Sequence, residues 1–320
     1  MTPVPTRHGA AAQWAGTVKG ATRRKYASAV DVFNSFLSEK ITSGRPYANY
    51  DDALCDHLRA IQRAGKGRQA GNLISAGLKH FRPGSRFPKA TKVLKSWAAR
   101  APSKPWPCIP EAALMLLVQE ALRRGWINVA GWLMISFCCL PRISAASRML
   151  FQDVALPGDP RFAGMSADCF VVVGYDKRQK TPRMVDVYDE LCVELLYILT
   201  ETQPANDWRL FRASSSTLRQ KMKTLCKALG WEHLNFVPHS LRYGGAVYDK
   251  AVRKLHVGDI QQRGRWKNPD TCLAYIQKGL GRLFRLNFPK SSEKELQGAA
   301  GIRKKLLRAL RRARRPPRGR

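Results

Sequence analysis

Apolar residues recur at helical spacing through most of the first hundred residues. In "TRRKYASAVDVFNSFLSEK" they follow one another at steps of four, three and four residues: Tyr26, Val30, Phe33 and Leu37. This spacing puts them on one face of a helix, and Thr22 suits its N-cap. The segments "DDALCDHLRAIQRAG", "RQAGNLISAGLKHF" and "KATKVLKSWAARA" repeat the pattern. We therefore expect a four-helix domain over residues 21–100, preceded by a flexible arm over residues 1–20.

The stretch "APSKPWPCIP" interrupts this pattern with four Pro in ten residues. Proline disfavours helix at its own position and at the residue before it. Residues 101–110 are therefore predicted to form an extended linker, with a domain boundary near residue 105. Beyond it, "EAALMLLVQEALRRG" and the apolar run 126–140 predict two helices. The run is too short to span a bilayer, so we interpret it as a buried helix.

A strand signal appears only in the middle of the chain. A polar helix, "ISAASRMLF", is expected first, and then the β-branched runs "CFVVV" and "RMVDVY" flank a polar turn with Lys177, Arg178 and Lys180. This is typical of a β-hairpin. Helices resume at "DELCVELLYILT", at "SSTLRQKMKTLCKALG" and from His239 onward. The predicted fold class is mainly α, with an α-rich second domain over residues 111–290 that holds a small antiparallel sheet.

The charge of the chain narrows its partners. It has 56 Lys plus Arg against 23 Asp plus Glu, a net charge of +33. Such a charge favours a polyanion, nucleic acid first and an anionic membrane second. Ten of the basic residues lie in 303–320, which has no acidic residue, so +23 belongs to the rest of the chain. The basic segment 291–320 is interpreted as a helix on DNA or on a neighbouring protomer, a nuclear targeting signal, or a disordered tail.

The cysteines and the N-terminal segment bear on the compartment. Eight Cys occur without a CxxC pair and without zinc-ligand spacing. The first 20 residues lack the apolar core of a secretory leader. We therefore expect reduced thiols and no secretion, with a nuclear location if the source is eukaryotic and a cytoplasmic one otherwise.

Two arginines and a histidine are candidates for holding an anion. His239 and Arg242 are three residues apart, so they share one face of a helix. Pro238 suits the start of that helix, where an anion is favoured. Arg142 follows the apolar run in "CLPRISAAS", and a charge beside an apolar core needs an anionic partner. Two guanidinium groups could together bind one phosphate; the alternatives for Arg142 are a surface position or an ion pair with Asp153.

Two aromatic residues and a lysine extend this set. Tyr275 lies nine residues after Trp266. An indole N–H can only donate, whereas a tyrosine hydroxyl must lose its proton before it attacks. Core packing is the alternative role of each ring. Lys177 or Lys180 of the predicted hairpin could protonate a leaving alkoxide, and a solvated turn lysine is the alternative.

In their order along the chain, these elements resemble the tyrosine recombinases, also called the phage-integrase family. The motifs that carry the resemblance are "LPRISAASRMLFQDV", "VVVGYDKRQKTPRMVDV", "HSLRYGGA" and "GRWKNPDTCLAY". The four-helix domain is similar to the family's core-binding domain, and the resemblance covers about residues 20–280. Two features depart from the family: Ala145 stands where an acidic residue is usual, and "RYGGA" replaces "RHTFA".

The resemblance implies a mechanism and a set of site residues: Arg142, Lys177, His239, Arg242, Trp266 and Tyr275. The tyrosine attacks a DNA phosphodiester and keeps it as a 3′-phosphotyrosyl bond. The arginines hold the non-bridging oxygens, the histidine assists proton transfer and the tryptophan braces the phosphate. The lysine protonates the leaving 5′-oxygen, and Lys177 is preferred over Lys180. Because one ester replaces another of similar energy, neither a cofactor nor a metal is implied.

The implied function is site-specific DNA recombination or integration, with a mobile element as the expected source. The implied partners are double-stranded DNA and further copies of the chain, four of them on two DNA sites, with no membrane partner. Three alternatives stay open: a domesticated, catalytically inactive DNA-binding protein of the same fold, a type IB topoisomerase-like enzyme, and a general basic chromatin or RNA-binding protein.

Overall fold

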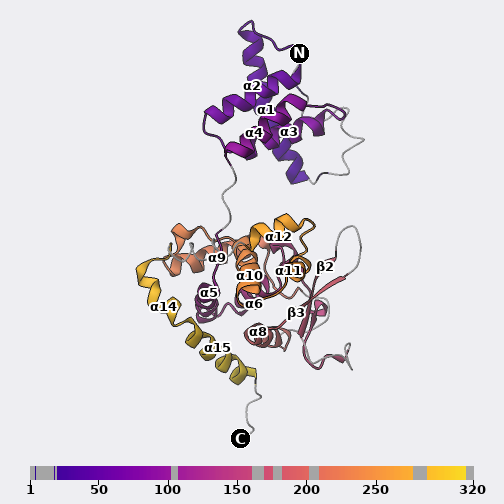
Figure 1. Ribbon diagram of the computed structural model, residues 1–320. Helices are drawn as coiled ribbons and strands as arrows, with labels where there is room; N and C mark the ends of the chain where they lie inside the picture. The colour runs from indigo at the N-terminus through magenta and orange to yellow at the C-terminus, as the bar shows by residue number, and fades with distance from the viewer. Residues whose placement is uncertain are drawn as a thin grey trace. The chain divides into compact units, whose positions relative to one another are not determined.

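The chain divides into two compact units, Met1–Pro105 (unit 1) and Trp106–Arg320 (unit 2). The computed structural model (Figure 1) describes Val4, Val18 and residues 20–101, 107–160, 169–175, 182–201, 209–276 and 287–314. Within these residues the chain is mainly helical and has one three-stranded antiparallel sheet. The predicted fold class is therefore confirmed.

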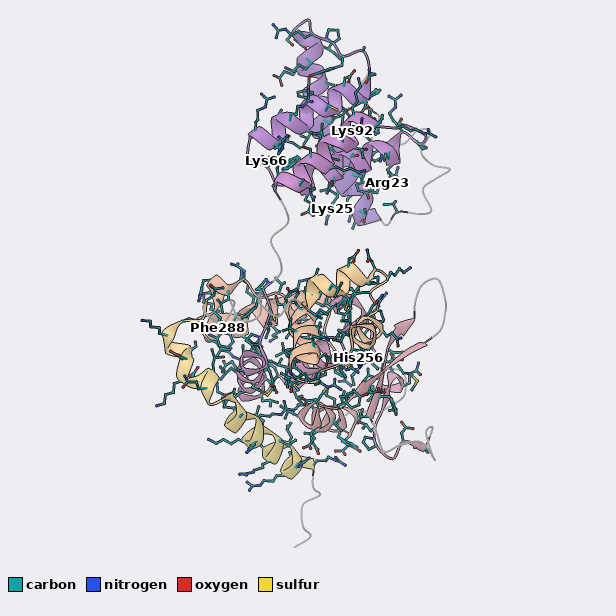
Figure 2. All side chains as sticks on the ribbon, viewed as in Figure 1. Arg23, Lys25, Lys66, Lys92, His256 and Phe288 are labelled. Carbon is teal, nitrogen blue, oxygen red and sulfur yellow. The ribbon has the colours of Figure 1, made fainter. Side chains whose placement is uncertain are left out.

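The described part of unit 1 is helical: α1 (Gly20–Thr42), α2 (Tyr50–Arg63), α3 (Arg68–Phe81) and α4 (Pro88–Arg100). The apolar face expected for the first helix is buried at Val30, Phe33 and Leu37. Thr22 lies inside α1 and does not cap it, because the helix already begins at Gly20. Cationic side chains, including Arg23, Lys25, Lys66 and Lys92, project from the unit (Figure 2).

Val4 lies in the predicted flexible arm, yet it is buried in the core of unit 1. Its backbone N–H donates to Oδ1 of Asn34 at 2.9 Å, and its carbonyl accepts from Nδ2 of Asn34 at 2.8 Å. At this residue the expectation of a loose arm is wrong, because the Asn34 side chain pairs with its backbone as a neighbouring strand would.

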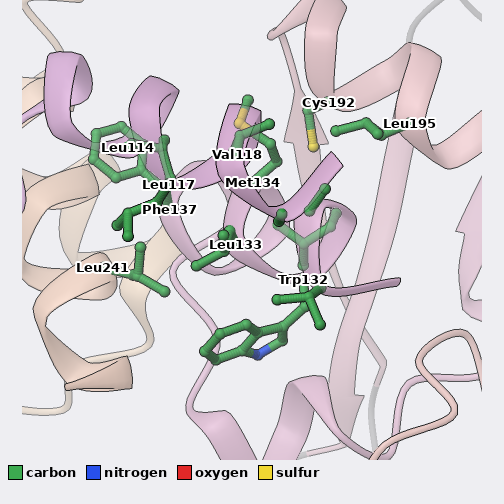
Figure 3. Close-up of a cluster of buried hydrophobic side chains, with 14 of the residues drawn as sticks. Leu114, Leu117, Val118, Trp132, Leu133, Met134, Phe137, Cys192, Leu195 and Leu241 are labelled. Atoms are coloured by element: carbon green, nitrogen blue, oxygen red, sulfur yellow. The ribbon is translucent and has the colours of Figure 1, made fainter. Parts of the chain in front are cut away.

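Unit 2 has one large apolar core. Its helices are α5 (Glu111–Arg123), α6 (Ile127–Cys138), α7 (Ile143–Ala146), α8 (Glu190–Glu201), α9 (Ser215–Ala228), α10 (Pro238–Ala251), α11 (Val257–Gly264), α12 (Pro269–Tyr275), α14 (Glu293–Gln297) and α15 (Ala299–Arg314). Side chains of α5, α6, α8 and α10 meet around Trp132, Leu133 and Phe137 (Figure 3). Every residue from Val129 to Phe137 is buried, as expected for the apolar run.

The sheet has the order β1 (Val154–Ala155), β2 (Cys169–Tyr175), β3 (Pro182–Val187), and both pairings are antiparallel. β2 and β3 form the predicted hairpin. The helix predicted over "ISAASRMLF" is wrong beyond the single turn α7. There the backbone pairs with another segment instead, since the Leu210 N–H donates to the Met149 carbonyl at 2.7 Å and Leu150 bridges to Arg209.

The end of the predicted linker belongs to unit 2. Cys108 and Ile109 are buried, and the Ile109 N–H donates to the Ser240 carbonyl of α10 at 3.3 Å. Two adjacent glycines of α10 allow this close approach. A Cβ at Gly244 would lie 2.0 Å from the Ile109 carbonyl oxygen, and one at Gly245 would lie 1.9 Å from that of Phe137. The two glycines of the unusual "RYGGA" are therefore required for the close packing of α10 against Ile109 and α6.

The basic segment after residue 291 also belongs to unit 2. α15 packs against α5 and α8 (Figure 1), where Leu310 is buried and Ile302, Leu306 and Leu307 contact the core. Arg303 forms ion pairs with Glu111 and Asp189. The expectation of a free tail, or of a helix on another molecule, is therefore wrong for the buried face of α15. No helix in the described ranges is long and apolar enough to cross a membrane.

Candidate active site

α10 presents two of the predicted site residues side by side. Pro238 is its first residue, and the Ser240 hydroxyl accepts from the Val237 N–H at 3.2 Å, which fixes the start of the helix. Because His239 and Arg242 are three residues apart, their side chains leave the helix on one face. The sequence pattern thus brings an imidazole and a guanidinium into one cluster.

α12 brings the candidate nucleophile to this face. Tyr275 is the last residue of α12, whose N-cap Asn268 accepts from the Asp270 N–H at 2.8 Å. The Tyr275 hydroxyl and Nε2 of His239 are hydrogen-bonded to each other. Tyr275 is half-buried, so its ring is supported by packing while the residue keeps a solvent-exposed part.

Arg242 is held from several directions at once. Only 3% of the residue is exposed, and its terminal nitrogens donate to the Leu140 carbonyl at 2.9 Å and to the Gly264 carbonyl. Its Nε–H is buried and has no hydrogen-bond partner among the described residues. The guanidinium lies 4.6 Å from the Trp266 ring, and the Trp266 and Tyr275 ring centroids are 4.8 Å apart. Trp266 thus packs against both the cation and the phenol.

Positive charge and burial together shift the pKa values of this cluster. Burial, followed by the charges of Arg242 and Arg142, lowers the pKa of His239 to about 4. His239 is therefore neutral at pH 7, and in the tautomer that carries the proton on Nδ1 its Nε2 can accept one. Burial, followed by the charge of Arg265, lowers the pKa of Arg242 to about 10, which leaves it charged at pH 7.

Arg142 acts electrostatically on the same cluster. The sequence predicted that it needs an anionic partner because it would lie beside the apolar core, and that expectation is wrong. Its side chain is exposed at the N-cap of α7, so no buried charge has to be neutralised. Its charge contributes to the lowered pKa of both His239 and Arg242. Asp153, the alternative partner, accepts from the Leu150 N–H at 2.8 Å. No ion pair joins Arg142 to a carboxylate within the described ranges.

The predicted general acid cannot be placed in this geometry. Lys177 and Lys180, together with Arg178, lie outside the described residues. The flanking strands β2 and β3 are described and paired, with Val171 opposite Val185. Ala145, at the position where the resemblance leads one to expect an acid, donates its N–H to the Arg142 carbonyl at 2.8 Å.

Two residues of the cluster were not predicted from the sequence. The Tyr243 hydroxyl donates to the Ala274 carbonyl at 3.2 Å, and its ring centroid is 5.3 Å from that of Tyr275. Burial raises the pKa of Tyr243 to about 12, so it stays a donor. Arg265 donates to the Leu140 carbonyl at 3.1 Å. The sequence could have indicated both residues only through their positions, since Tyr243 directly follows Arg242 and Arg265 directly precedes Trp266.

The cluster is suited to displacement at an anionic ester. It holds a phenol hydrogen-bonded to a neutral imidazole. The Arg242 guanidinium lies over the Trp266 ring, which also packs against the phenol, and Arg142 and Arg265 add positive charge to the cluster. Such cations stabilise the charge that develops on a phosphorane, and the imidazole can accept the phenolic proton. No group of three or more His, Cys, Asp or Glu side chains in the described ranges could hold a metal ion.

Comparisons with known proteins show the same architecture. The chain is similar to the site-specific recombinase XerH in a post-cleavage complex with palindromic difH substrate, with a TM-score of 0.61, 13% identity, and coverage of 86% of this chain and 80% of that one. It is similar to the Tn1549 transposon integrase in complex with transposon right end DNA, with a TM-score of 0.59, 12% identity, and coverage of 86% and 96%.

A lambda integrase dimer bound to a COC′ core site gives a TM-score of 0.58 at 14% identity and covers 84% of this chain and 75% of that one. No protein-family model and no curated protein sequence matches the chain. At these identities the likeness establishes a shared fold.

Proposed function

We propose that this chain, whose fold is that of the tyrosine recombinases, is a site-specific DNA recombinase or integrase that works through a 3′-phosphotyrosyl intermediate. The observation that carries the proposal is the hydrogen bond between Tyr275 and His239 beside the buried guanidinium of Arg242. Core packing alone explains neither the hydrogen bond of the neutral His239 imidazole to the Tyr275 phenol nor the burial of the Arg242 cation near them.

The reaction uses these residues in one displacement. Tyr275 Oη forms a bond to the phosphorus as the bond to the 5′-oxygen breaks, and His239 Nε2 accepts the phenolic proton. Arg142 and Arg242 stabilise the non-bridging oxygens. The buried Nε–H of Arg242 has no other partner among the described residues, so it could donate to them once DNA is bound. Trp266 packs against both Arg242 and Tyr275 and so fixes the two side chains relative to each other. We assign protonation of the leaving 5′-oxygen to Lys177, with Lys180 as the alternative.

Double-stranded DNA is the proposed partner. The chain has a net charge of +33, and both units carry exposed cationic side chains. Contacts with phosphates would therefore dominate the affinity for DNA and make it strongly salt-dependent. Several neighbours were solved on DNA, among them a lambda integrase dimer on a core site and a lambda integrase tetramer on a Holliday junction. We propose assembly of several copies on DNA for this chain as well, and a mobile element as its source.

Covalent trapping tests the proposal. The protein is incubated with a library of nicked duplexes of randomised sequence and stopped with SDS, and the adducts are resolved on a denaturing gel. Tyr275→Phe should abolish the adduct while DNA affinity stays within about twofold, because the lost hydroxyl is uncharged. Tyr248→Phe is the matched control. It removes another phenol of unit 2, whose ring packs on Phe137, and should keep the adduct.

The alternatives predict different results. A catalytically inactive DNA-binding protein, to which Ala145 lends weight, would bind the duplexes and give no adduct with any of them. A type IB topoisomerase-like enzyme would give the adduct and also relax supercoiled plasmid without a specific site. Adducts that map to one sequence, together with exchange between two such sites, are expected of a recombinase.

A further inference from the structure

One guanidinium ties four elements of unit 2 together. Arg263 of α11 donates from Nε to the Asp249 carboxylate of α10 at 3.1 Å. Its terminal nitrogens donate to the Asp186 carbonyl of β3 at 3.2 Å and to the Cys138 carbonyl of α6 at 2.7 Å. The Arg263 side chain is 10% exposed and that of Asp249 is 4% exposed. We call these four residues the Arg263 clamp.

Folding alone does not require this clamp. Taking two charges out of water costs free energy that their mutual attraction often fails to repay, and apolar side chains of similar volume are commonly as stable. A buried pair that also satisfies two backbone carbonyls from different elements instead specifies where those elements lie.

Both backbone carbonyls that hold Arg242 lie next to the clamp. One terminal nitrogen of Arg242 donates to the carbonyl of Gly264, the residue after Arg263. The other donates to the carbonyl of Leu140, two residues beyond Cys138. The clamp thus joins the two segments, at the ends of α6 and α11, that carry the acceptors of the buried guanidinium.

The backbone at these two places is strained. Leu140 has φ 52° and Arg265 has φ 54°, a left-handed conformation that side-chain-bearing residues rarely adopt. The φ of Arg265 turns the peptide plane that contains the Gly264 carbonyl. Such a conformation costs about 1–3 kcal/mol and persists only where the surroundings impose it. The clamp residues Cys138 and Arg263 each lie two residues before one of these positions, so the clamp can supply that constraint.

We propose that Arg263 is a positioning residue for Arg242: by fixing α11 against α6 and α10, it aims the Gly264 and Leu140 carbonyls and so orients the guanidinium at the scissile phosphate. The inference rests on the proposed function for its catalytic consequence. Its structural content, that Arg263 sets the position of Arg242, stands apart from any reaction.

The chain offers a matched control in Arg253. Its guanidinium also pairs with Asp249, at 2.9 Å, and also lies over the Tyr188 ring, at 4.1 Å against 5.5 Å for Arg263. It makes no hydrogen bond to the Cys138 or Asp186 carbonyl, and it is not adjacent to a residue that holds Arg242. The variants Arg263→Lys and Arg253→Lys therefore both weaken the pairing of Asp249, and only the first breaks the link to α6 and β3.

The first measurement is the single-turnover rate of adduct formation at saturating DNA, on a nicked duplex that the wild-type protein cleaves. Arg263→Lys should lower this rate at least about 10-fold, since small misplacements of catalytic groups cost that much. DNA affinity should stay within about twofold because the charge is kept. Arg253→Lys should stay within about threefold of the wild-type rate. Equal rate losses in the two variants, or a wild-type rate in Arg263→Lys, would overturn the proposal.

A second measurement needs no reaction and no DNA. The Nε–Hε NMR signal of Arg242 reports its burial in the free protein. In Arg263→Lys this signal should shift and its hydrogen should exchange faster, whereas Arg253→Lys should leave it unchanged. If wild-type protein forms no adduct while the signal responds in this way, the proposed function fails and the positioning role stands. An unperturbed signal in Arg263→Lys refutes the positioning role whatever the activity.

Discussion

The Tyr275 hydroxyl and the His239 imidazole share a hydrogen bond, although 36 residues separate them in the chain. α12 supplies the phenol from its last residue and α10 supplies the imidazole from its first turn. In the proposed reaction neither residue can act without the other. A phenol needs a proton acceptor to become a nucleophile, and an imidazole with a lowered pKa can accept a proton at neutral pH.

The pKa of His239 is the first quantity to test. Removal of the Arg142 charge by Arg142→Gln should raise it from about 4 toward its usual value, because a nearby cation disfavours the imidazolium. The folded-state pKa lies below that of the unfolded chain, about 6.5. Its contribution to stability is therefore complete above that value and is lost as pH falls toward 4. Histidine Cε1–H NMR titration measures the pKa in both proteins, and denaturant unfolding between pH 7 and pH 4 measures the stability; an unchanged pKa in Arg142→Gln contradicts the placement of Arg142.

The glycine pair of α10 gives a second prediction. A methyl group at position 245 would collide with the Phe137 carbonyl, so Gly245→Ala should lower the free energy of unfolding by about 3 kcal/mol. Gly258→Ala is the control, because nothing lies within 4 Å of a Cβ there and alanine is the better helix former by about 1 kcal/mol. Urea titration followed by circular dichroism measures both. A wild-type stability for Gly245→Ala would mean that α10 and α6 are further apart.

Much of the fold could be predicted from local patterns. Apolar periodicity predicted α1 to α4, which each bury one face, and apolar runs predicted α5 and α6. The hairpin followed from its β-branched runs. The pattern failed where long-range pairing decides the structure: β1 has two residues, and the turn after α7 is fixed by a partner some 60 residues away. The docking of α15 was missed because its arginines were interpreted without their acidic partners on α5 and α8.

The site divides in the same way. His239, Arg242, Trp266 and Tyr275 could be named because their side-chain chemistry and spacing are visible in the sequence. Their roles, like that of Lys177, stay predictions. The Leu140 and Gly264 carbonyls carry no sequence signal, since any residue has a carbonyl, and the Arg263 clamp joins positions up to 125 residues apart. Residues that orient a site through backbone groups need the three-dimensional structure.

The ion pairs of Arg303 should determine whether α15 stays docked. Arg303→Ala removes its pairs with Glu111 and Asp189, and partly buried pairs of this kind are worth about 2 kcal/mol. The neighbouring Lys304 is exposed, so Lys304→Ala should change stability by less than about 0.5 kcal/mol. Hydrogen exchange of the α15 amides should accelerate only in the first variant. Equal protection in both would show that α15 stays docked without the Arg303 pairs.

His57 makes unit 1 sensitive to acid. It is 4% exposed and packs against Phe33 and Phe36, and neither ring nitrogen has a hydrogen-bond partner among the described residues. Burial lowers the pKa of His57. In the unfolded chain His57 takes up a proton near pH 6.5, whereas in the folded chain it stays neutral at that pH. The free energy of unfolding should therefore fall as the pH drops below that value.

His57→Phe keeps a ring of similar shape and removes the titrating group, so it should flatten this dependence. The measurement is the thermal unfolding midpoint of the full chain between pH 7.5 and pH 5, with His233→Phe as the control because His233 is exposed. The midpoint of the wild type and of the control should drop by several degrees over this range, and that of His57→Phe by less. If His57→Phe loses as much as the wild type, protons are taken up elsewhere and His57 is not the group that senses acid.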